Sequence, residues 1–480
     1  SGVFPGADIM KIEEESLREK LFDLCKKHNL IPEPAFLEKV LQLYQILRIH
    51  HGVMMVGPTG AGKSAAWRLL LEATSLIEEK KGESYIIDPK AITKDELYGK
   101  LDPTTLEWTD GVFTQVLRRI LDNVRGESNR RHWIIFDGDV DPEWAENLNS
   151  VLDDNKLLTL PNGERLLIPN NVRIMFEVET LKYATLATVS RCGMVWFSAE
   201  TVSIDMVYHH YLCRLTQENF DELIKDDEKE TSLTPVRKDC VSAISKYFKG
   251  EDCFVTKALQ YAESRPHIMD FTRIRVLEAM FALVRKGITN VIEYNDSHPD
   301  FPLSMSQIED YMTKWLSMSL MWGIGGSLNL KEREAFSNMI QELAEFDMPP
   351  SSGVPLLDYE VRIEDQAWHM WKKKGPNVDI ETHKVIDADV VITTIDTLRH
   401  QEILCSWLSE HRPFLLCGPP GSGKTMTLMA TLKALPDFEM IFVNFSSSTT
   451  PELILKTFDH YCEYSRTPNG VVLRPHQPNK

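Results

Sequence analysis

The sequence predicts an α/β protein made of two copies of one unit, each with a parallel-sheet core and an α-helical partner. Both copies open with a short apolar strand, a glycine-rich turn and a helix, at residues 50–82 and 412–436. Matching residues then recur at separations of 361, 356 and 359: Lys63 with Lys424, Glu96 with Glu452, and Gly111 with Gly470. A nearly constant offset over three markers indicates a duplicated unit of roughly 360 residues.

The first copy yields most of its elements in order. Residues 50–56 predict a strand and 65–82 a helix, and residues 131–139 and 170–178 predict two further buried strands. Asn162-Gly163, between apolar runs, is typical of a two-residue hairpin turn. From about Ile204 the strands stop, and amphipathic stretches at 271–288 and 307–322 predict helices. The acidic segment 218–230 predicts a solvated loop or helix face.

Composition narrows the possible functions. The formal net charge is 53 − 71 = −18, which argues against direct nucleic-acid binding because that usually needs a basic stripe. The eight cysteines include no CxxC pair, so they signal neither a zinc site nor a disulfide framework and favour a reducing compartment. No apolar run is long enough to predict a membrane span. Ser1, with no signal-peptide pattern after it, predicts an excerpt of a longer chain.

Each glycine-rich turn matches the P-loop pattern GxxxxGK[ST]. In such a loop backbone N–H groups wrap phosphate oxygens, the following helix adds its dipole, and the glycines allow positive φ. Lys63 and Lys424 are expected to reach the β- and γ-phosphates, and Ser64 and Thr425 to bind Mg²⁺. The sequence therefore predicts ATP (or ADP) and Mg²⁺ at two sites: Gly57, Pro58, Thr59, Gly60, Ala61, Gly62, Lys63 and Ser64, and Gly418, Pro419, Pro420, Gly421, Ser422, Gly423, Lys424 and Thr425.

The usual partner of a P-loop is an aspartate that ends a buried strand and holds the water shell of Mg²⁺. Asp137, after the apolar residues 133–136, matches this role; alternatively it caps the next turn. Lys63 and Asp137 are 74 residues apart, and the same spacing from Lys424 leads to position 498, outside this sequence. Only the first site is therefore expected to be complete here.

Residues 86–113, 133–166 and 187–197 resemble the second AAA+ module of the dynein heavy chains, of the cytoplasmic type, and residues 418–428 and 445–473 resemble the opening half of the third. The resemblance runs over essentially the whole chain. It implies P-loop NTPase AAA+ modules, each a parallel-sheet αβα large subdomain with an α-helical small subdomain. A cluster of Pro, Ser and Gly at residues 347–361 predicts the break between them.

The expected domains follow from this resemblance. Residues 1–30 are a lead-in from the preceding module, 31–203 the large subdomain of the second module and 204–346 its helical small subdomain. Residues 347–395 are a linker and the start of the next module, and 396–480 the N-terminal part of the third module, ending before its magnesium-binding strand.

The resemblance also implies how the first site works. Active modules carry a glutamate after the strand-end aspartate, where this chain has Gly138. Because losing a positioned general base costs about 10²–10⁴ in rate, the site is expected to bind ATP with slow or no hydrolysis. Glu177 lies near the sensor position, where active modules carry an asparagine, which favours the same conclusion.

Further residues match family positions. Arg191 matches the arginine finger that reaches the nucleotide of the preceding module, or it is a strand-entry arginine paired at the surface. Arg273, favoured over Arg275, matches a second sensor arginine, with a solvent-facing arginine as the alternative. Leu30 and Ile31 resemble the apolar lid over adenine, or they pack in the core.

The function implied is an ATP-binding segment in the AAA+ ring of a microtubule motor ATPase of the cytoplasm and cytoskeleton. The expected partners are neighbouring modules of the same chain and, in the full protein, microtubules, other dynein chains and dynactin, with neither nucleic acid nor membrane. Two alternatives stay open. The first module is an active ATPase with Asp139 or Glu143 as its base, or the chain belongs to a dynein-like remodelling machine of the midasin type.

Overall fold

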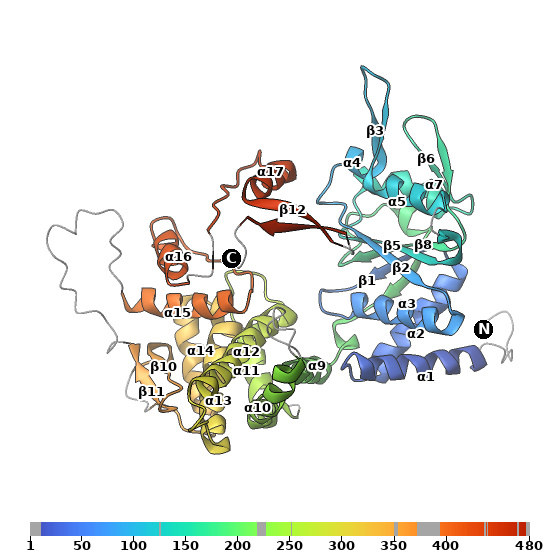
Figure 1. The fold of residues 1–480 in the computed structure, drawn as a ribbon. Coiled ribbons are helices and arrows are strands. Elements are labelled where there is room, and N and C mark those ends of the chain that lie inside the picture. Colours follow the sequence, from blue (N-terminus) through green and yellow to red (C-terminus); the bar gives the residue numbers. More distant parts are fainter. Residues whose placement is uncertain are drawn as a thin grey trace. The chain divides into compact units, whose positions relative to one another are not determined.

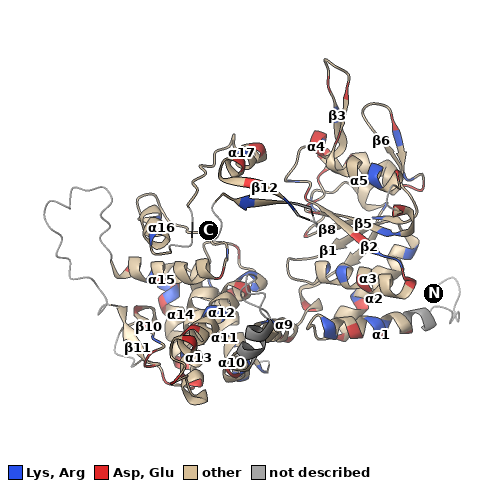
Figure 2. Cartoon of the chain, in the orientation of Figure 1, with Lys and Arg blue, Asp and Glu red and all other residues tan. Residues whose placement is uncertain are grey.

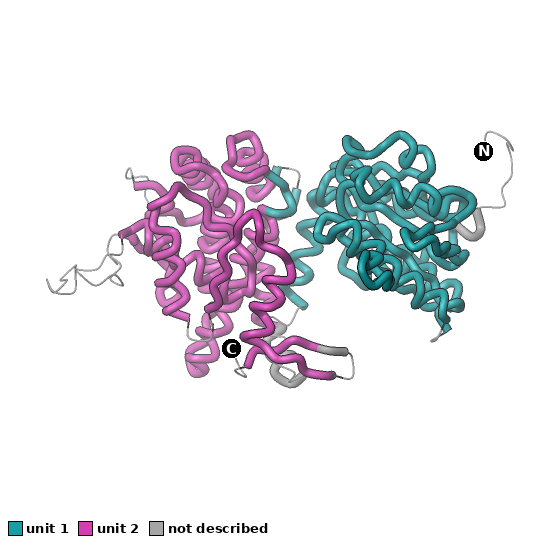
Figure 3. Tube along the Cα trace, turned by 90° about the horizontal axis from the view of Figure 1, so that it is seen from above, with its two compact units in different colours: residues 1–234, 248–253, 271–275 teal, residues 235–247, 254–270, 276–480 magenta. Residues whose placement is uncertain are grey.

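The protein forms two compact units (Figures 1 and 3). Unit 1 comprises residues Ser1–Thr234, Phe248–Cys253 and Phe271–Arg275, and unit 2 comprises Pro235–Tyr247, Phe254–Asp270 and Val276–Lys480. This computed structural model describes residues 11–123, 126–217, 227–250, 252–349, 354–371, 394–435, 438, 440–467 and 470–476.

Unit 1 is built on a five-stranded sheet in which every neighbouring pair is parallel. The strand order is β2 (Gly82–Ile87), β5 (Arg131–Asp137), β8 (Val172–Val178), β1 (Gly52–Val56) and β9 (Gly193–Trp196). The strands predicted at 50–56, 131–139 and 170–178 are therefore confirmed. Crossovers between parallel strands require long connections, and here helices supply them.

Helices cover both faces of this sheet and make unit 1 a three-layer αβα structure (Figure 1). One face packs against α1 (Lys11–Lys27), α2 (Pro34–Ile49) and α3 (Lys63–Glu78), and the other against α5 (Val112–Leu121), α6 (Pro142–Ala145) and α7 (Asn149–Leu152). In β1, Val53 and Met55 join the first core, and Met54 and Val56 join the second. This strand is apolar throughout because both of its faces are buried.

Two antiparallel hairpins project from unit 1 (Figure 1). The first, β3 (Gly99–Leu101) with β4 (Trp108–Asp110), follows the short helix α4 (Lys94–Tyr98). The second joins β6 (Leu157–Thr159) to β7 (Arg165–Leu167) and has Gly163 at a φ of 86°. The predicted hairpin is therefore confirmed, but its turn is longer than the two residues expected. Leu160 N donates to Glu164 O and Gly163 N donates to Leu160 O, each at 2.9 Å, so residues 161–163 form the loop. Unit 1 also contains α8 (Leu186–Val189) and α9 (Ile204–Gln217).

From the end of β9 to residue 343, the elements of the described residues are helices. The helices are α10 (Asp227–Ser245), α11 (Phe254–Glu263), α12 (Arg273–Ser297), α13 (Met305–Ser319), which continues in a π-helical turn (Leu320–Ile324), and α14 (Leu330–Leu343). Helices α12 and α13 confirm the predictions at 271–288 and 307–322. Of the acidic segment, residues 218–226 lie outside the described residues, and 227–230 begin α10.

The region of the second P-loop repeats part of the plan of unit 1. A short hairpin of β10 (Tyr359–Val361) and β11 (Trp368–Met370) precedes α15 (Ile395–Ser409). The loop then leads into α16 (Lys424–Lys433). Helix α17 (Pro451–Tyr461) is followed by an antiparallel hairpin, β12 (Cys462–Thr467) with β13 (Gly470–Pro475), as α4 is followed by β3 and β4.

The strand predicted at residues 412–417 is wrong: these residues form no strand, and Leu415 is 74% exposed. A strand needs hydrogen-bonded neighbours, and β1 in unit 1 has β8 and β9 on its two sides. Both neighbours begin more than 110 residues after β1 ends, at 172 and 193 against 56. The described residues that follow 412–417 offer no such partner.

Three further features of the structure concern its charged residues, its cysteines and the apolar character of its helices. Acidic and basic residues are interspersed over both units (Figure 2). All eight cysteines belong to the described residues, and none of them is in a disulfide bond. None of the described helices has the combination of length and apolar character that a membrane crossing needs.

Gly57, the residue directly after β1, offers a test of how tightly the sheet is packed. A Cβ atom there would lie 2.0 Å from the backbone oxygen of Phe197. We expect Gly57→Ala to lower the free energy of unfolding by about 1–3 kcal/mol, because backbone atoms have to move. Denaturant titration measures this, with Gly326→Ala as the control, since a Cβ there meets nothing within 4 Å. Equal midpoints for the two variants would contradict the packing argument.

Candidate functional site

A cavity of about 590 Å³ lies at the carboxyl edge of the sheet in unit 1. Parallel strands end at the same edge, so residues that follow β1, β5 and β8 meet there. Its charged and polar lining comprises Thr59, Lys63, Ser64, Lys90, Asp137, Asp139, Glu177, Glu179, His210 and Tyr211, together with the glycines Gly60, Gly62 and Gly138. The volume lies in the range of about 300–1,000 Å³ usual for small-molecule sites.

The loop between β1 and α3 has the backbone of a phosphate cradle. Gly60 and Gly62 have φ values of 84° and 89°, which side chains other than glycine rarely adopt. A Cβ on Gly60 would lie 2.4 Å from Cγ1 of Ile274, so neither the backbone nor the space allows another residue. Lys63 is buried, and its Nζ donates to the carbonyl oxygens of Gly57 at 2.6 Å and Pro58 at 2.9 Å.

Glu177 connects the end of β8 to the start of α3. Its carboxylate accepts a hydrogen bond from Ser64 Oγ at 2.5 Å and another from Trp67 Nε1 at 3.1 Å. Glu177 is buried and lines the cavity. The serine predicted to bind Mg²⁺ therefore has a carboxylate as its hydrogen-bond partner.

Asp137 ends β5, opposite Glu177 in the paired register of β5 and β8. Burial, then Glu177 and Asp88, raise the pKa of the Asp137 carboxyl, and Lys63 and Arg68 oppose this. Burial also lowers the pKa of the Lys63 ammonium, against the attraction of Glu177, Glu179 and Asp137. Lys63 and the two carboxylates thus form one electrostatic group.

Gly138 follows Asp137 with a φ of 147°. A Cβ there would make ordinary contacts, 3.6 Å from Asp88 Oδ1 and 3.6 Å from Pro89 Cδ, so space is available. The backbone is the obstacle, since L residues with such a φ are strained by about 1–3 kcal/mol.

The two substitute bases considered for the first site are placed differently. Asp139 lines the cavity, but its carboxylate pairs with Lys90 Nζ at 2.6 Å. Glu143 is exposed, lies in the short helix α6 and is outside the cavity lining. Neither carboxylate therefore occupies the position that a glutamate directly after Asp137 would give it.

Apolar residues from distant parts of unit 1 complete the cavity. Leu30 lines it, whereas Ile31 packs against the core beside α1–α3 and is not part of the lining. Ile274 lines it, whereas its neighbours Arg273 and Arg275 do not. Sequence reasoning missed Phe36, Ala65, Lys90, Val178, Glu179, Val202, Met206, Val207, His210, Tyr211 and Ile274. The apolar residues at the start of α9 could have indicated part of this cavity wall, because α9 begins shortly after β9, the last strand of the sheet in sequence order.

The charges of the cavity suit a metal–nucleotide complex better than a bare nucleotide. Lys63 and Lys90 face four carboxylates, Asp137, Asp139, Glu177 and Glu179. A triphosphate alone would meet a net negative site, whereas a divalent cation offsets that repulsion. Carboxylate and hydroxyl oxygens are the ligands that Mg²⁺ prefers, so the residues present fit Mg²⁺ together with phosphate.

Arg191 lies at the opposite edge of the sheet. It precedes β9, whose amino end is on the side away from the Lys63 cavity. Its Nε donates to Asp153 Oδ1 at 2.5 Å and its Nη1 to the carbonyl oxygen of Ala187 at 2.7 Å. Arg191 therefore does not meet the nucleotide cavity of its own unit.

The second P-loop has the same local conformation as the first. Gly421 and Gly423 have φ values of 78° and 76°, and Lys424 Nζ donates to Gly418 and Pro419 carbonyl oxygens at 2.8 Å each. A Cβ on either glycine would meet nothing within 4 Å, in contrast to Gly60 and Gly62. The loop is thus preformed but has no enclosing wall among the described residues.

Four protein-family models match the chain. They are described as the AAA domain of the dynein-related subfamily (residues 52–192), the dynein heavy chain AAA lid domain (244–373), the P-loop containing dynein motor region (381–469) and the hydrolytic ATP binding site of dynein motor region (1–64).

Curated proteins named "Dynein heavy chain, cytoplasmic" are similar along nearly the whole chain. That of Paramecium tetraurelia is 58% identical over 484 residues (99% of this chain), that of Dictyostelium discoideum 55% over 518 (100%), and that of Drosophila melanogaster 51% over 497 (100%). This chain spans 11% of the length of each of these relatives.

The carboxylates around Lys63 predict how affinity depends on pH. Because the pKa of Asp137 is raised, its carboxyl is protonated at a higher pH than a free aspartate, and the affinity for Mg²⁺–ATP should fall as pH drops through that pKa. Glu177→Gln removes a cause of the raised pKa and should move this fall to lower pH. Asp137→Asn should weaken binding about 10–100-fold and abolish the pH step.

Fluorescent-nucleotide titrations at a series of mildly acidic to neutral pH values measure these effects. Glu179→Gln is the matched control, because it removes the same charge from the same cavity without being a cause of the Asp137 shift. If Glu177→Gln and Glu179→Gln displaced the pH profile equally, the specific coupling of Glu177 to Asp137 would be refuted.

Proposed function

The chain belongs to the dynein heavy chain family, and on that premise we propose that its first AAA+ module holds Mg²⁺–ATP without hydrolysing it efficiently. One observation carries the proposal: the cavity contains a complete phosphate cradle and a strand-end aspartate, but Gly138 follows Asp137. A site that binds phosphates but has no general base positioned beside them is better suited to retaining ATP than to hydrolysing it.

The residues divide the work as follows. Backbone N–H groups of the loop from Gly57 to Ser64 and the Lys63 ammonium bind the phosphates, and Leu30 covers the apolar part of the nucleotide. Ser64 and Asp137 would hold Mg²⁺, whose charge would offset that of the phosphates and carboxylates. Ser64 Oγ donates to Glu177, which also accepts from Trp67, so Glu177 would keep a hydrogen-bond partner if Ser64 bound the metal.

The retained nucleotide then acts as a structural cofactor. A ligand bound only by the folded state stabilises it by about 4 kcal/mol at a thousandfold excess over Kd. Such a module would stiffen the ring and transmit movement between hydrolysing neighbours. The second P-loop of this chain, which would belong to the third module of the ring, would bind nucleotide in the same way through Lys424 and Thr425.

In the whole protein we propose an ATP-driven microtubule motor of the cytoplasm and cytoskeleton. Its partners would be the neighbouring AAA+ modules, other dynein chains, dynactin and microtubules. Family membership removes the reason to prefer a remodelling machine of the midasin type. The alternative of an active first site is disfavoured, because Asp139 is paired with Lys90 and Glu143 lies outside the cavity.

We propose further that Arg191 is an arginine finger for the preceding module. It lies at the edge of the sheet away from its own nucleotide cavity, as a residue acting on a neighbour must. Its pairing with Asp153 would hold the guanidinium near the surface until the neighbour's phosphates compete for it.

The proposed retention of ATP is tested on the purified chain. Chromatography of extracted nucleotide should show bound ATP or ADP, which Lys63→Met reduces. Single-turnover phosphate release should be about 10²–10⁴ slower than at a site with a placed base. Asp139→Asn and Glu143→Gln should leave this slow rate unchanged. Release at tens per second, or its loss in either carboxylate variant, would establish the active-site alternative instead.

The arginine finger is tested in a heavy chain that contains the preceding module. Arg191→Ala should reduce hydrolysis at that module by about 10³–10⁵, because charge on the transferring phosphoryl group loses its partner. Asp153→Asn is the matched control: it removes the other member of the ion pair and should leave hydrolysis close to that of the unmodified chain. Equal losses in both variants would show that the pair is structural.

A further inference from the structure

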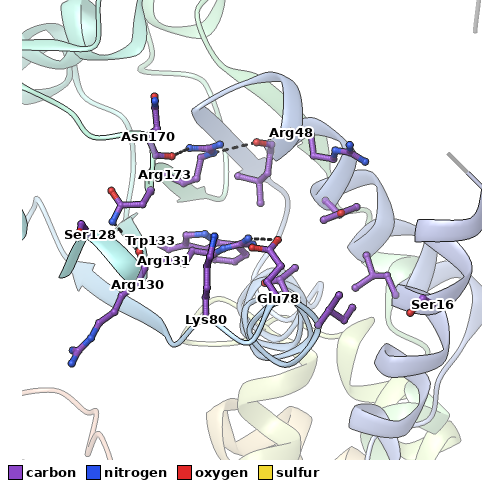
Figure 4. Close-up of a pocket in the computed structure, with 16 residues that line it drawn as sticks. Ser16, Arg48, Glu78, Lys80, Ser128, Arg130, Arg131, Trp133, Asn170 and Arg173 are labelled. Atoms are coloured by element: carbon purple, nitrogen blue, oxygen red, sulfur yellow. Dashed lines mark hydrogen bonds and ion pairs between the residues drawn. The ribbon is translucent and has the colours of Figure 1, made fainter. Parts of the chain in front are cut away.

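A second cavity of unit 1, of about 850 Å³, lies at the amino edge of the sheet (Figure 4). Residues at the starts of β5 and β8 line it together with residues from α1, α2 and the end of α3. It shares no lining residue with the Lys63 cavity, which is at the carboxyl edge. It is therefore a separate site.

The lining of this cavity is basic, although the chain is acidic. Sixteen residues line it, and five of them are Arg48, Lys80, Arg130, Arg131 and Arg173, against the single acidic residue Glu78. With 53 basic and 71 acidic residues in 480, sixteen residues of average composition would include about two of each. The excess of positive charge is local.

Arg130 and Arg131 have carboxylate partners among the described residues. Arg130 Nη1 lies 2.5 Å from Glu83 Oε1, and in Figure 4 its side chain extends away from the other sticks. Arg131 Nη2 lies 2.5 Å from Glu78 Oε1, and this pair is drawn beside Trp133. The charge of Arg130 is thus offset by Glu83, which is not part of the cavity lining. The charge of Arg131 is offset by Glu78, which is part of it.

Arg173 has no carboxylate partner among the described residues. Its guanidinium donates only to backbone carbonyl oxygens, those of Leu47 at 3.2 Å, Asn170 at 2.7 Å and Val172 at 3.0 Å. Arg173 is half-buried, so solvent screens its charge incompletely.

Arg131 and Arg173 also act on each other. Burial, and secondly the positive charge of Arg131, lower the pKa of the Arg173 guanidinium. Two like charges at one cavity wall repel, and an anion between them would offset the repulsion and supply the missing partner.

We propose that this cavity binds a small phosphorylated molecule through Arg131, Arg173 and Lys80. Guanidinium groups match phosphate oxygens with paired N–H donors, and Lys80, which is exposed, adds a mobile charge at the rim. The volume is that of a small-molecule site, and Trp133 provides an apolar wall for the part of the ligand that carries the phosphate.

Calorimetric titration with inorganic pyrophosphate tests the proposal, in a Lys63→Met, Lys424→Met background that removes phosphate binding at the two P-loops. We expect measurable binding that Arg173→Gln weakens about tenfold or more, as loss of a charge-assisted hydrogen bond would. Arg119→Gln is the control: this exposed arginine of α5 lies over the Tyr85 ring, outside the cavity, and its loss changes the net charge equally.

A second variant keeps the test decisive if Arg173→Gln fails to fold, as judged by circular dichroism. Lys80→Gln affects only an exposed side chain and should weaken pyrophosphate binding severalfold. The proposal is overturned if the background protein does not bind pyrophosphate. It is equally overturned if Arg119→Gln weakens binding as much as the cavity variants do, since the effect would then be one of net charge.

Discussion

The first nucleotide cavity depends on the way β1 is held between β8 and β9. All five residues of β1 are buried, and the chain that leaves it is hydrogen-bonded on both sides: Gly57 N donates to Val178 O at 3.1 Å, and Phe197 N donates to Val56 O at 2.7 Å. These bonds fix where the loop begins, and α3 fixes where it ends. The second P-loop shows the contrast. It has the same glycine conformations without flanking strands, so the loop conformation is local while its enclosure comes from the sheet.

This division explains how much the sequence could predict. Loop residues, strand-end Asp137 and the hairpin at Asn162-Gly163 are local signals, and each was found where expected. The strand at 412–417 failed because apolar character alone cannot supply hydrogen-bonded neighbours. The apolar wall of the cavity was missed for a related reason: Phe36 and Ile274 are 238 residues apart in sequence and meet only through the fold. At α12 the family resemblance implied a role for Arg273, and the structure adds the adjacent Ile274 as a lining residue of the cavity.

The two edges of the sheet in unit 1 have opposite electrostatic character. Carboxylates outnumber lysines at the carboxyl edge, where Asp137 and Glu177 lie side by side in register. Arginines gather at the amino edge, around Arg131 and Arg173. Since residues of the same strands, β5 and β8, supply both sets, the strands present acidic groups where they end and basic groups where they begin. A cation-dependent ligand suits the first edge and an anion the second.

The backbone at Gly138 also limits what a single substitution could do at this site. Replacing this glycine by glutamate would put a side chain on a residue whose φ is 147°, although a Cβ there would make only ordinary contacts. Such a replacement would not simply install a base beside Asp137: it would carry a strain of about 1–3 kcal/mol unless the chain direction after β5 changed as well. Engineering at this position would have to redesign the backbone turn together with the side chain.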